Sequence, residues 1–292
     1  MKTFLLLIFF TSAVIPQNNN NEKLTPIEIG FSAQLFDDVD IRDAEAAIHI
    51  WGNEFFGKLG INYFPTTKIF QDDEEIIRAL NENKLDFISL PTTDYFNIMK
   101  KTAIEPYFMA LGDANTGINY ILVARKDKNI SSIRDLKNSQ IILHSGSFEK
   151  LVKMWLETIL NEHKEKSTNF FSEVTVADKP SQALLPVFFK QKDACIVLEQ
   201  SYQSMIELNP QLKNELMIIE KSPEFVGGIM CINKNVSEDI KKIALDTAKK
   251  LSKTTSGKQI LALFKAKKLV KYNPEYLKKT KELYDKYNKI KK

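Results

Sequence analysis

The sequence predicts an α/β protein of two lobes that share one internal design. Three observations lead to this prediction: the chain length, the alternation of short apolar runs with helical periods, and one pattern that occurs twice. The chain has 292 residues, which is enough for about two domains. A chain of this size can bury a large hydrophobic core, and 43% of its residues are hydrophobic.

Short apolar runs mark the expected strands, and apolar residues spaced three and four apart mark the expected helices. Strands are expected at residues 26–31, 61–64, 87–90, 118–125, 141–143, 195–198 and 228–232. Helical stripes run through residues 44–55, 74–80 and 148–159. Because strands and helices alternate along the chain, we expect each lobe to hold a mostly parallel sheet flanked by helices.

The repeated pattern lies at residues 76–93 and again at residues 183–201. Each copy reads as a helix, a turn containing Lys and Asp, an apolar strand, and a polar loop that leads into the next helix. The separation of the copies is too large for a solenoid repeat. Two lobes of similar design, each with a polar loop at a strand end, explain the pattern better.

Residues 1–17 have the pattern of a secretory signal peptide. Lys2 precedes an apolar run at residues 4–10, and small residues follow at 11–13. The run is shorter than the roughly 20 apolar residues that span a bilayer. No cysteine lies near it, so a lipoprotein anchor has no acceptor. We expect a cleaved signal peptide and a periplasmic protein, with an uncleaved anchor as the alternative.

Composition excludes several classes of function. The 41 basic and 37 acidic residues give a net charge of +4, which is too weak and too dispersed for a nucleic-acid binder. Three scattered histidines do not suggest a metal site, and no cofactor motif is present. Cys195 and Cys231 fall on strands of different lobes, so two buried free thiols are expected rather than a disulfide.

Ligands of open α/β sheets bind beyond the carboxyl ends of the strands, so the loops after the expected strands are the candidate site. Helix starts there offer free N–H groups, and hydroxyl side chains can donate to an anion. Arginine is rare in this chain, so an anion site would depend on backbone amides, hydroxyls or lysine. Helix capping and core packing are the alternative roles. The candidate residues are Gln34, Phe36, Thr92, Thr93, Tyr95, His144, Ser145, Gly146, Ser147 and Glu199.

Four segments together resemble the substrate-binding proteins of ABC importers, of the phosphate/phosphonate type. They are residues 27–32, residues 77–95, residues 119–137 and the Ser-Gly-Ser turn at 145–147. The resemblance implies a type II periplasmic binding protein fold, in which two lobes joined by two crossovers close on a ligand by a hinge motion. Lobe one would comprise residues 25–115 and 225–292, and lobe two residues 116–224.

The resemblance also implies roles for single residues. Phosphonate-binding members use a Ser-Thr-Ser-Gly loop at the start of a lobe-two helix, where this chain has Ser145-Gly146-Ser147-Phe148 and lacks one hydroxyl. Tyr95 matches the tyrosine that follows the threonine-rich loop. Glu199 matches an acid that would meet an amine or hydroxyl of the ligand. The departure at Gly146 and Phe148 leaves the choice between phosphonate and other anions open.

The function expected from these features is that of an extracytoplasmic solute-binding protein. It would capture a small phosphonate- or phosphate-like anion between closing lobes and deliver it to the membrane permease of an ABC importer, acting as a monomer. One alternative is a ligand-sensing protein for a membrane signalling receptor. The other is an enzyme on the same fold, but the sequence holds none of the common nucleophile or phosphate-loop motifs.

Overall fold

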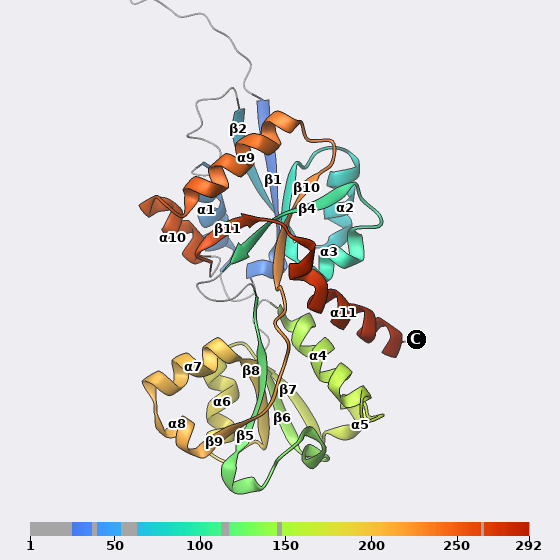
Figure 1. Ribbon diagram of the computed structural model, residues 1–292, viewed down its shortest axis with the longest axis vertical. Coiled ribbons are helices and arrows are strands. Elements are labelled where there is room, and N and C mark those ends of the chain that lie inside the picture. Colours follow the sequence, from blue (N-terminus) through green and yellow to red (C-terminus); the bar gives the residue numbers. More distant parts are fainter. Residues whose placement is uncertain are drawn as a thin grey trace, which may run out of the picture.

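The computed structural model describes residues 25–36, 40–53, 63–111, 117–144, 148–263 and 266–291. The expected signal peptide, the Ser-Gly-Ser turn and the ends of two expected elements near residues 55 and 61 lie outside these residues. The described chain forms two α/β lobes, one above the other in Figure 1, with two connecting segments between them. The two-lobed architecture expected from the sequence is confirmed.

Lobe one is built on a six-stranded sheet in the order β11-β4-β10-β3-β1-β2. Strands β1 and β2 are parallel, as are β1 and β3, whereas β10 runs antiparallel to both β3 and β4, and β11 runs antiparallel to β4. The strands are β1 (Thr25–Ser32), β2 (Tyr63–Phe70), β3 (Phe87–Pro91), β4 (Ile104–Leu111), β10 (Gly228–Asn233) and β11 (Lys268–Lys271).

Lobe two is built on a five-stranded sheet in the order β7-β6-β8-β5-β9. Strand β6 is parallel to β7 and β8, and β5 is antiparallel to β8 and β9. The strands are β5 (Tyr120–Arg125), β6 (Gln140–His144), β7 (Glu173–Ala177), β8 (Ala194–Leu198) and β9 (Leu216–Lys221).

Most strands of each sheet run in the same direction, as the alternation of elements suggested, but both sheets are mixed. The reason is the route of the chain between the lobes. Strands β5 and β10 each follow a segment that crosses from the other lobe. Each consequently enters its sheet from the opposite end and runs antiparallel to the strands beside it.

Helices cover both faces of each sheet (Figure 1). In lobe one they are α1 (Ile41–Gly52), α2 (Asp73–Asn81), α3 (Thr92–Ile98), α9 (Glu238–Leu251) and α10 (Thr255–Leu263), with a 3-10 turn at Ala33–Phe36. In lobe two they are α4 (Glu149–Asn161), α5 (Ser167–Phe170), α6 (Pro180–Phe188), α7 (Glu199–Leu208) and α8 (Gln211–Glu215), with 3-10 turns at Lys126–Lys128 and Ile133–Leu136. The last helix is α11 (Pro274–Ile290).

Alternating side chains of the central strands feed two cores per lobe, one on each face of the sheet. In β5, for example, Tyr120 and Leu122 pack with α4, whereas Ile121 and Val123 pack with α6. Cys195 and Cys231 are buried and free in different lobes, as expected, and burial raises the pKa of both thiols. The continuous apolar runs of the sequence thus mark strands that are covered on both sides.

The two crossovers lie against each other. Ile118 and Phe225 exchange backbone hydrogen bonds of 2.7 and 2.8 Å. A side chain at Gly117 would place its Cβ 2.1 Å from the carbonyl oxygen of Phe225, so only glycine fits this close approach. The two crossovers are therefore hydrogen-bonded to each other where they pass between the lobes.

Helix α11 spans the two lobes. Leu277 packs in the lobe-one core beside α3, whereas Leu283 packs in the lobe-two core beside α4. The buried Thr280 accepts a 2.8 Å hydrogen bond from the backbone N–H of Val226 in the second crossover. The sequence analysis assigned the whole of residues 225–292 to lobe one, but the second half of this helix also packs on lobe two (Figure 1).

Four strands were not expected from the sequence: β4, β7, β9 and β11. Strand β4 contains Pro106, which the strand pattern disfavours, and β7 and β11 are sheet edges with half-exposed residues.

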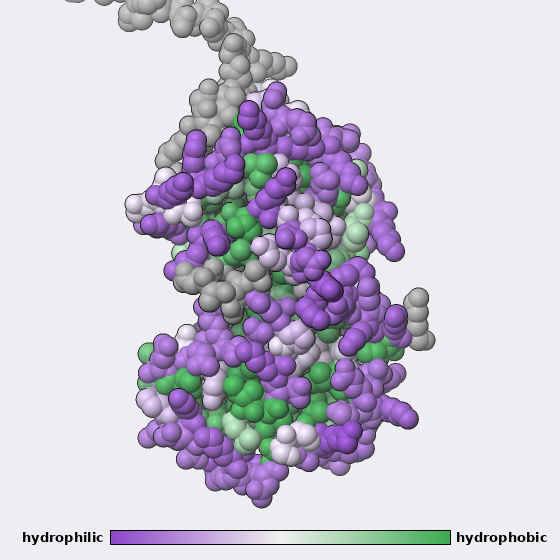
Figure 2. Space-filling model, viewed as in Figure 1, coloured by the Kyte–Doolittle hydropathy of each residue, from purple (hydrophilic) through white to green (hydrophobic). Residues whose placement is uncertain are grey.

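Figure 2 shows one face of the molecule as largely hydrophilic, with hydrophobic areas on both lobes. Among the described helices, none is long and apolar enough to cross a bilayer.

Candidate functional site

The starts of α3 and α4 meet where the two lobes face each other. Helix α3 begins directly after β3, and the backbone N–H of Thr92 donates a 2.8 Å hydrogen bond to the carbonyl oxygen of Gly227 in the second crossover. Helix α4 begins shortly after β6 in the other lobe. The predicted residues 92–95 and the start of the helix that follows β6 therefore lie at the same junction.

An ion pair joins the two helix starts. The Lys150 Nζ in the first turn of α4 lies 2.6 Å from the Asp94 Oδ1 in the first turn of α3. The Asp94 side chain is fully buried, whereas that of Lys150 is 47% exposed. The hydroxyl of Thr93 donates a longer hydrogen bond of 3.3 Å to the same Asp94 oxygen. The contact links residues of opposite lobes through a buried carboxylate.

Two buried polar atoms at this junction have no partner among the described residues. They are the hydroxyl oxygen of Thr92 and the Oδ2 of Asp94, and both residues have no exposed surface. A buried polar atom without a hydrogen bond costs about 1–3 kcal/mol, and native structures contain few of them. At this junction, the hydroxyl of Thr92 and one carboxylate oxygen of Asp94 therefore lack hydrogen bonds to other described residues.

Phe148 shapes the lobe-two side of the junction. Its ring lies against Gly227, where a Cβ would approach the ring carbons to 2.6 Å. The hydroxyl of the buried Tyr120 donates a 3.2 Å hydrogen bond to the Phe148 carbonyl oxygen. The start of α4 is therefore fixed against the second crossover, which also holds the start of α3.

Acidic groups outnumber basic groups here. Burial raises the pKa of Asp73, the first residue of α2, and the nearby charge of Asp94 raises it further, whereas Lys150 lowers it in part. The Asp73 Oδ1 is a third buried atom without a partner in the described chain. Two carboxyl groups therefore share one lysine.

The other predicted residues have varied surroundings. His144 is buried at the end of β6, and Tyr95 packs in the lobe-one core, where burial raises the pKa of its hydroxyl. Glu199, the first residue of α7, is 25% exposed and forms a 2.7 Å ion pair with Lys221. Gln34 is half-buried in its 3-10 turn, and Phe36 packs on Phe31 with ring centroids 6.1 Å apart.

Ligand contact by these residues stays a prediction. So does contact by Ser145, Gly146 and Ser147, which lie outside the described residues between His144 and Phe148. Asp94 and Lys150 were not among the candidates, although both stand within three residues of predicted ones. The scarcity of arginine had left lysine, beside backbone amides and hydroxyls, as a possible partner of an anion.

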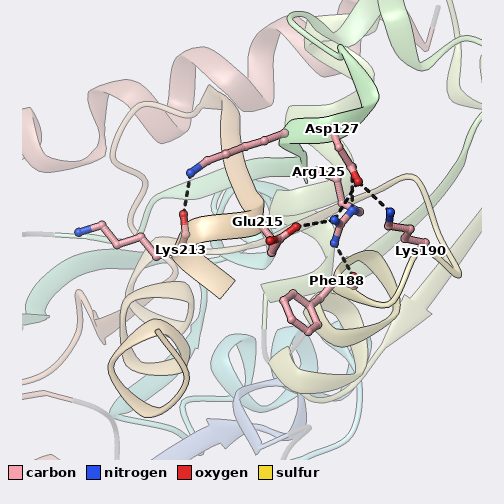
Figure 3. A network of polar contacts seen from close by, with 7 residues as sticks. Arg125, Asp127, Phe188, Lys190, Lys213 and Glu215 are labelled. Atoms are coloured by element: carbon pink, nitrogen blue, oxygen red, sulfur yellow. Dashed lines mark hydrogen bonds and ion pairs between the residues drawn. The ribbon is translucent and has the colours of Figure 1, made fainter. Parts of the chain in front are cut away.

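A second polar cluster lies at the outer end of lobe two (Figure 3). The nearly buried Arg125 donates to both carboxylate oxygens of Asp127 at 2.8 and 2.9 Å, to Glu215 at 2.6 Å and to the Phe188 carbonyl at 2.6 Å. Lys190 adds an ion pair of 2.9 Å to Asp127. This cluster ties the ends of β5, α6 and α8 together and is complete in itself.

A pocket of about 360 Å³ lies at the far end of the lobe-one sheet from the lobe junction. It is lined by Asn83, Asp86, Asn233, Asn235 and Val236. Its polar side chains hydrogen-bond to neighbouring protein groups: Asp86 accepts from the Glu28 N–H, and the Asn235 side chain donates to the Asn83 side chain. The described residues contain no cluster of three or more potential metal ligands there or elsewhere.

Comparisons with known proteins agree with this architecture. Residues 46–277 match the family model of the periplasmic substrate-binding proteins of phosphonate ABC transporters. The chain belongs to this family, whose role is to capture a solute for an importer. No curated protein matches the chain in sequence.

Solved structures share the fold at low sequence identity. The PhnD1 protein of Prochlorococcus marinus, solved with methylphosphonate, is 17% identical, with a TM-score of 0.64 over 92% of this chain and 100% of that one. A phosphonate-transporter binding protein of Pseudomonas aeruginosa is 17% identical, with a TM-score of 0.63 over 92% and 88%. A Xanthomonas citri protein solved with ATP is 11% identical, with a TM-score of 0.66 over 91% and 98%.

Proposed function

We propose that this protein binds a small phosphorus oxyanion between the starts of α3 and α4 and passes it to the permease of an ABC importer. It acts by binding alone, as a monomer. It reaches the periplasm through the signal peptide at residues 1–17, without a lipid anchor. Methylphosphonate, the ligand in the Prochlorococcus structure, is the first candidate.

The observation that supports this proposal most strongly is the junction itself. Two helix starts from opposite lobes meet there, and one lysine contacts a buried carboxylate between the lobes. The Thr92 hydroxyl has no partner in the part of the chain that the structure describes. The first N–H groups of a helix point away from its body and attract an anion, and α4 begins at this junction. The helix start and the Lys150 ammonium would each attract an oxyanion, although Lys150 is also paired with Asp94.

A thermal-shift screen of the purified protein tests the proposal. The panel is phosphate, phosphite, methylphosphonate, aminoethylphosphonate, sulfate and amino acids. A ligand at 100 times its Kd adds about 2.7 kcal/mol of stability, which raises the midpoint by about 5 °C or more. The proposal predicts such a shift with a phosphorus oxyanion, and its weakening in Ser147→Ala. A shift with amino acids alone, or with no compound, contradicts it.

A matched pair of lysine variants locates the site. Lys150 and Lys153 lie on the same helix with side chains 47% and 48% exposed, but Lys153 pairs with Glu149 of its own helix. We expect Lys150→Met to weaken binding of the anion at least about tenfold, because a charged hydrogen bond is lost. Lys153→Met should leave the Kd within about twofold. Equal effects of the two variants would place the ligand elsewhere.

A further inference from the structure

We propose that a lysine-rich surface of lobe one docks the protein on a membrane leaflet that carries anionic lipids. This surface, called the basic face below, lies on α9, on the turn after it and on β11. Its exposed lysines are Lys242, Lys249, Lys250, Lys253, Lys268 and Lys271. The inference goes beyond the proposed ligand and does not depend on it.

The first observation is an uneven distribution of charge along the chain. Residues 234–292 hold 18 of the 41 basic residues and 6 of the 37 acidic residues, a net charge of +12, so residues 1–233 carry −8. All 18 basic residues of the segment are lysines. The weak charge of the whole chain, which the sequence analysis treated as dispersed, therefore combines two regions of opposite sign.

The fold gathers part of this charge on one surface. The buried residues of α9 repeat at helical spacing from Ile240 to Leu251, so its outer face presents three lysines of the basic face, and Lys253 follows in the next turn. Strand β11, at the edge of the sheet, packs beside α9 and carries the other two. In Figure 1, α9 lies across the front of lobe one, and Figure 2 shows mainly hydrophilic side chains there.

Neighbouring acids offset little of this charge. Within the part of the chain that the structure describes, the basic face forms one ion pair, between Lys249 and Asp246 of the same helix at 3.3 Å. Glu238, in the first turn of α9, pairs with Lys241, which is not part of the face. The field of the remaining lysines extends about 10 Å into a solution of 0.1 M salt, so an anionic surface would be attracted before contact.

The chemistry of lysine favours a membrane over a protein partner. Its ammonium is a compact, hydrated point charge, whereas contacts of fixed geometry favour the planar fork of arginine, and residues 234–292 contain no arginine. Protein interfaces are enriched in arginine and depleted in lysine. A layer of anionic headgroups requires charge without fixed geometry, and each lysine near it raises the affinity about fivefold.

The position of the basic face also suits a protein that serves a membrane importer. Its six lysines belong to elements of lobe one, apart from the crossovers and from α11, which packs on both lobes. A docked protein would therefore keep lobe two free to move. Contact with the leaflet would also confine its search for the permease to a surface, which raises the rate of encounter.

Vesicle co-sedimentation tests the proposal, with vesicles of phosphatidylcholine alone and with about one quarter phosphatidylglycerol. The measured quantity is the ratio of the two affinities, because the apolar run at residues 4–10, wherever it is retained, would bind both vesicles alike. We expect a preference for anionic vesicles of at least about 20-fold at low salt, which falls towards one as salt rises. A ratio near one at low salt would overturn the proposal, and so would binding of duplex DNA without this preference.

A matched pair of double variants locates the contact. Lys242→Gln with Lys250→Gln removes two charges from the basic face, whereas Lys128→Gln with Lys213→Gln removes two from exposed positions of lobe two. Lysine and glutamine have similar helix propensities, so both variants should fold. We expect the first variant to lower the ratio at least about fivefold and the second to leave it within about twofold.

Equal losses in the two variants would show that net charge alone drives the binding, and would refute the basic face. The Kd for methylphosphonate should be unchanged in both variants, because none of the four lysines lies at the lobe junction. Loss of ligand binding and loss of vesicle binding are therefore separate results. The first contradicts the proposed function, and the second contradicts the membrane contact.

Discussion

Two buried polar clusters in this protein differ in whether the chain completes them. At the outer end of lobe two, Arg125 finds acceptors on three different residues (Figure 3). At the junction of the lobes, Thr92 and Asp94 are buried at least as deeply, but each has an oxygen with no partner among the described residues. Completed polar burial supports the fold, whereas incomplete burial leaves hydrogen-bonding capacity that, under the proposed function, a ligand would use.

The same contrast holds for two threonines. Thr92 and Thr280 both have no exposed surface, and both lie close to the second crossover. The Thr280 hydroxyl accepts from the Val226 N–H, whereas the Thr92 hydroxyl has no partner in the described chain. Stability should therefore depend on one hydroxyl and binding on the other.

The largest expected effect is that of Arg125→Met. The substitution removes the donor of the Phe188 carbonyl and of Glu215 and leaves Asp127 with Lys190 alone. We expect the free energy of unfolding to fall by about 2–3 kcal/mol, since the carboxylates are partly exposed to water. Urea denaturation measures this loss. The Kd for methylphosphonate should not change. A tenfold weaker Kd at unchanged stability would break the distinction between the clusters.

The threonine pair should give the next largest effect. Thr280→Val removes the acceptor of a buried N–H, so we expect a loss of about 1–2 kcal/mol in the free energy of unfolding with little change in affinity. Thr92→Val replaces an unpaired hydroxyl by a methyl group of the same shape, so stability should stay equal or rise slightly. Affinity for methylphosphonate should fall about tenfold. Chemical denaturation measures the stability of both variants, and calorimetry measures their affinity. A loss of affinity in Thr280→Val or a loss of stability in Thr92→Val would contradict the prediction.

The smallest effect concerns acid. The pKa of Asp73 is raised in the folded protein, so its ionisation costs stability as pH rises above the ordinary value of 3.8. Asp73→Asn should therefore be more stable than the unmodified protein at neutral pH, and the difference should vanish below about pH 4.

Asp127 provides the opposite case. Its hydrogen bonds with Arg125 lower its pKa, so its contribution to stability is present above its ordinary value and is lost as pH falls. Asp127→Asn should therefore destabilise the protein at neutral pH and converge with it in acid. Thermal melts from pH 3 to 7 test both signs. If the two variants shifted the melting temperature in the same direction at every pH, the opposite pKa shifts of Asp73 and Asp127 would be contradicted.

Much of the fold was predictable from the sequence, because strands covered on both faces are continuous apolar runs. Residues 87–90 and 195–198 are examples, and both became central strands. Strand β7, by contrast, has exposed Val174 and Val176 at a sheet edge, and β4 includes a proline. Their pairing depends on neighbours that local sequence does not reveal.

The candidate site was predictable only in part. Thr92 was found because it follows a strand, and strand ends of α/β sheets carry ligand sites. The pairing of Asp94 with Lys150 was not found, because it joins residues 56 positions apart in different lobes. Such a contact follows from how the lobes face each other across the crossovers, which no local pattern encodes.

The most direct test of the account is a crystal structure of the protein with methylphosphonate. The account predicts the phosphonate group at the start of α4, with its oxygens about 3 Å or less from the Thr92 hydroxyl and the Lys150 ammonium. A phosphonate bound away from this junction, without contact to Thr92 or Lys150, would contradict it.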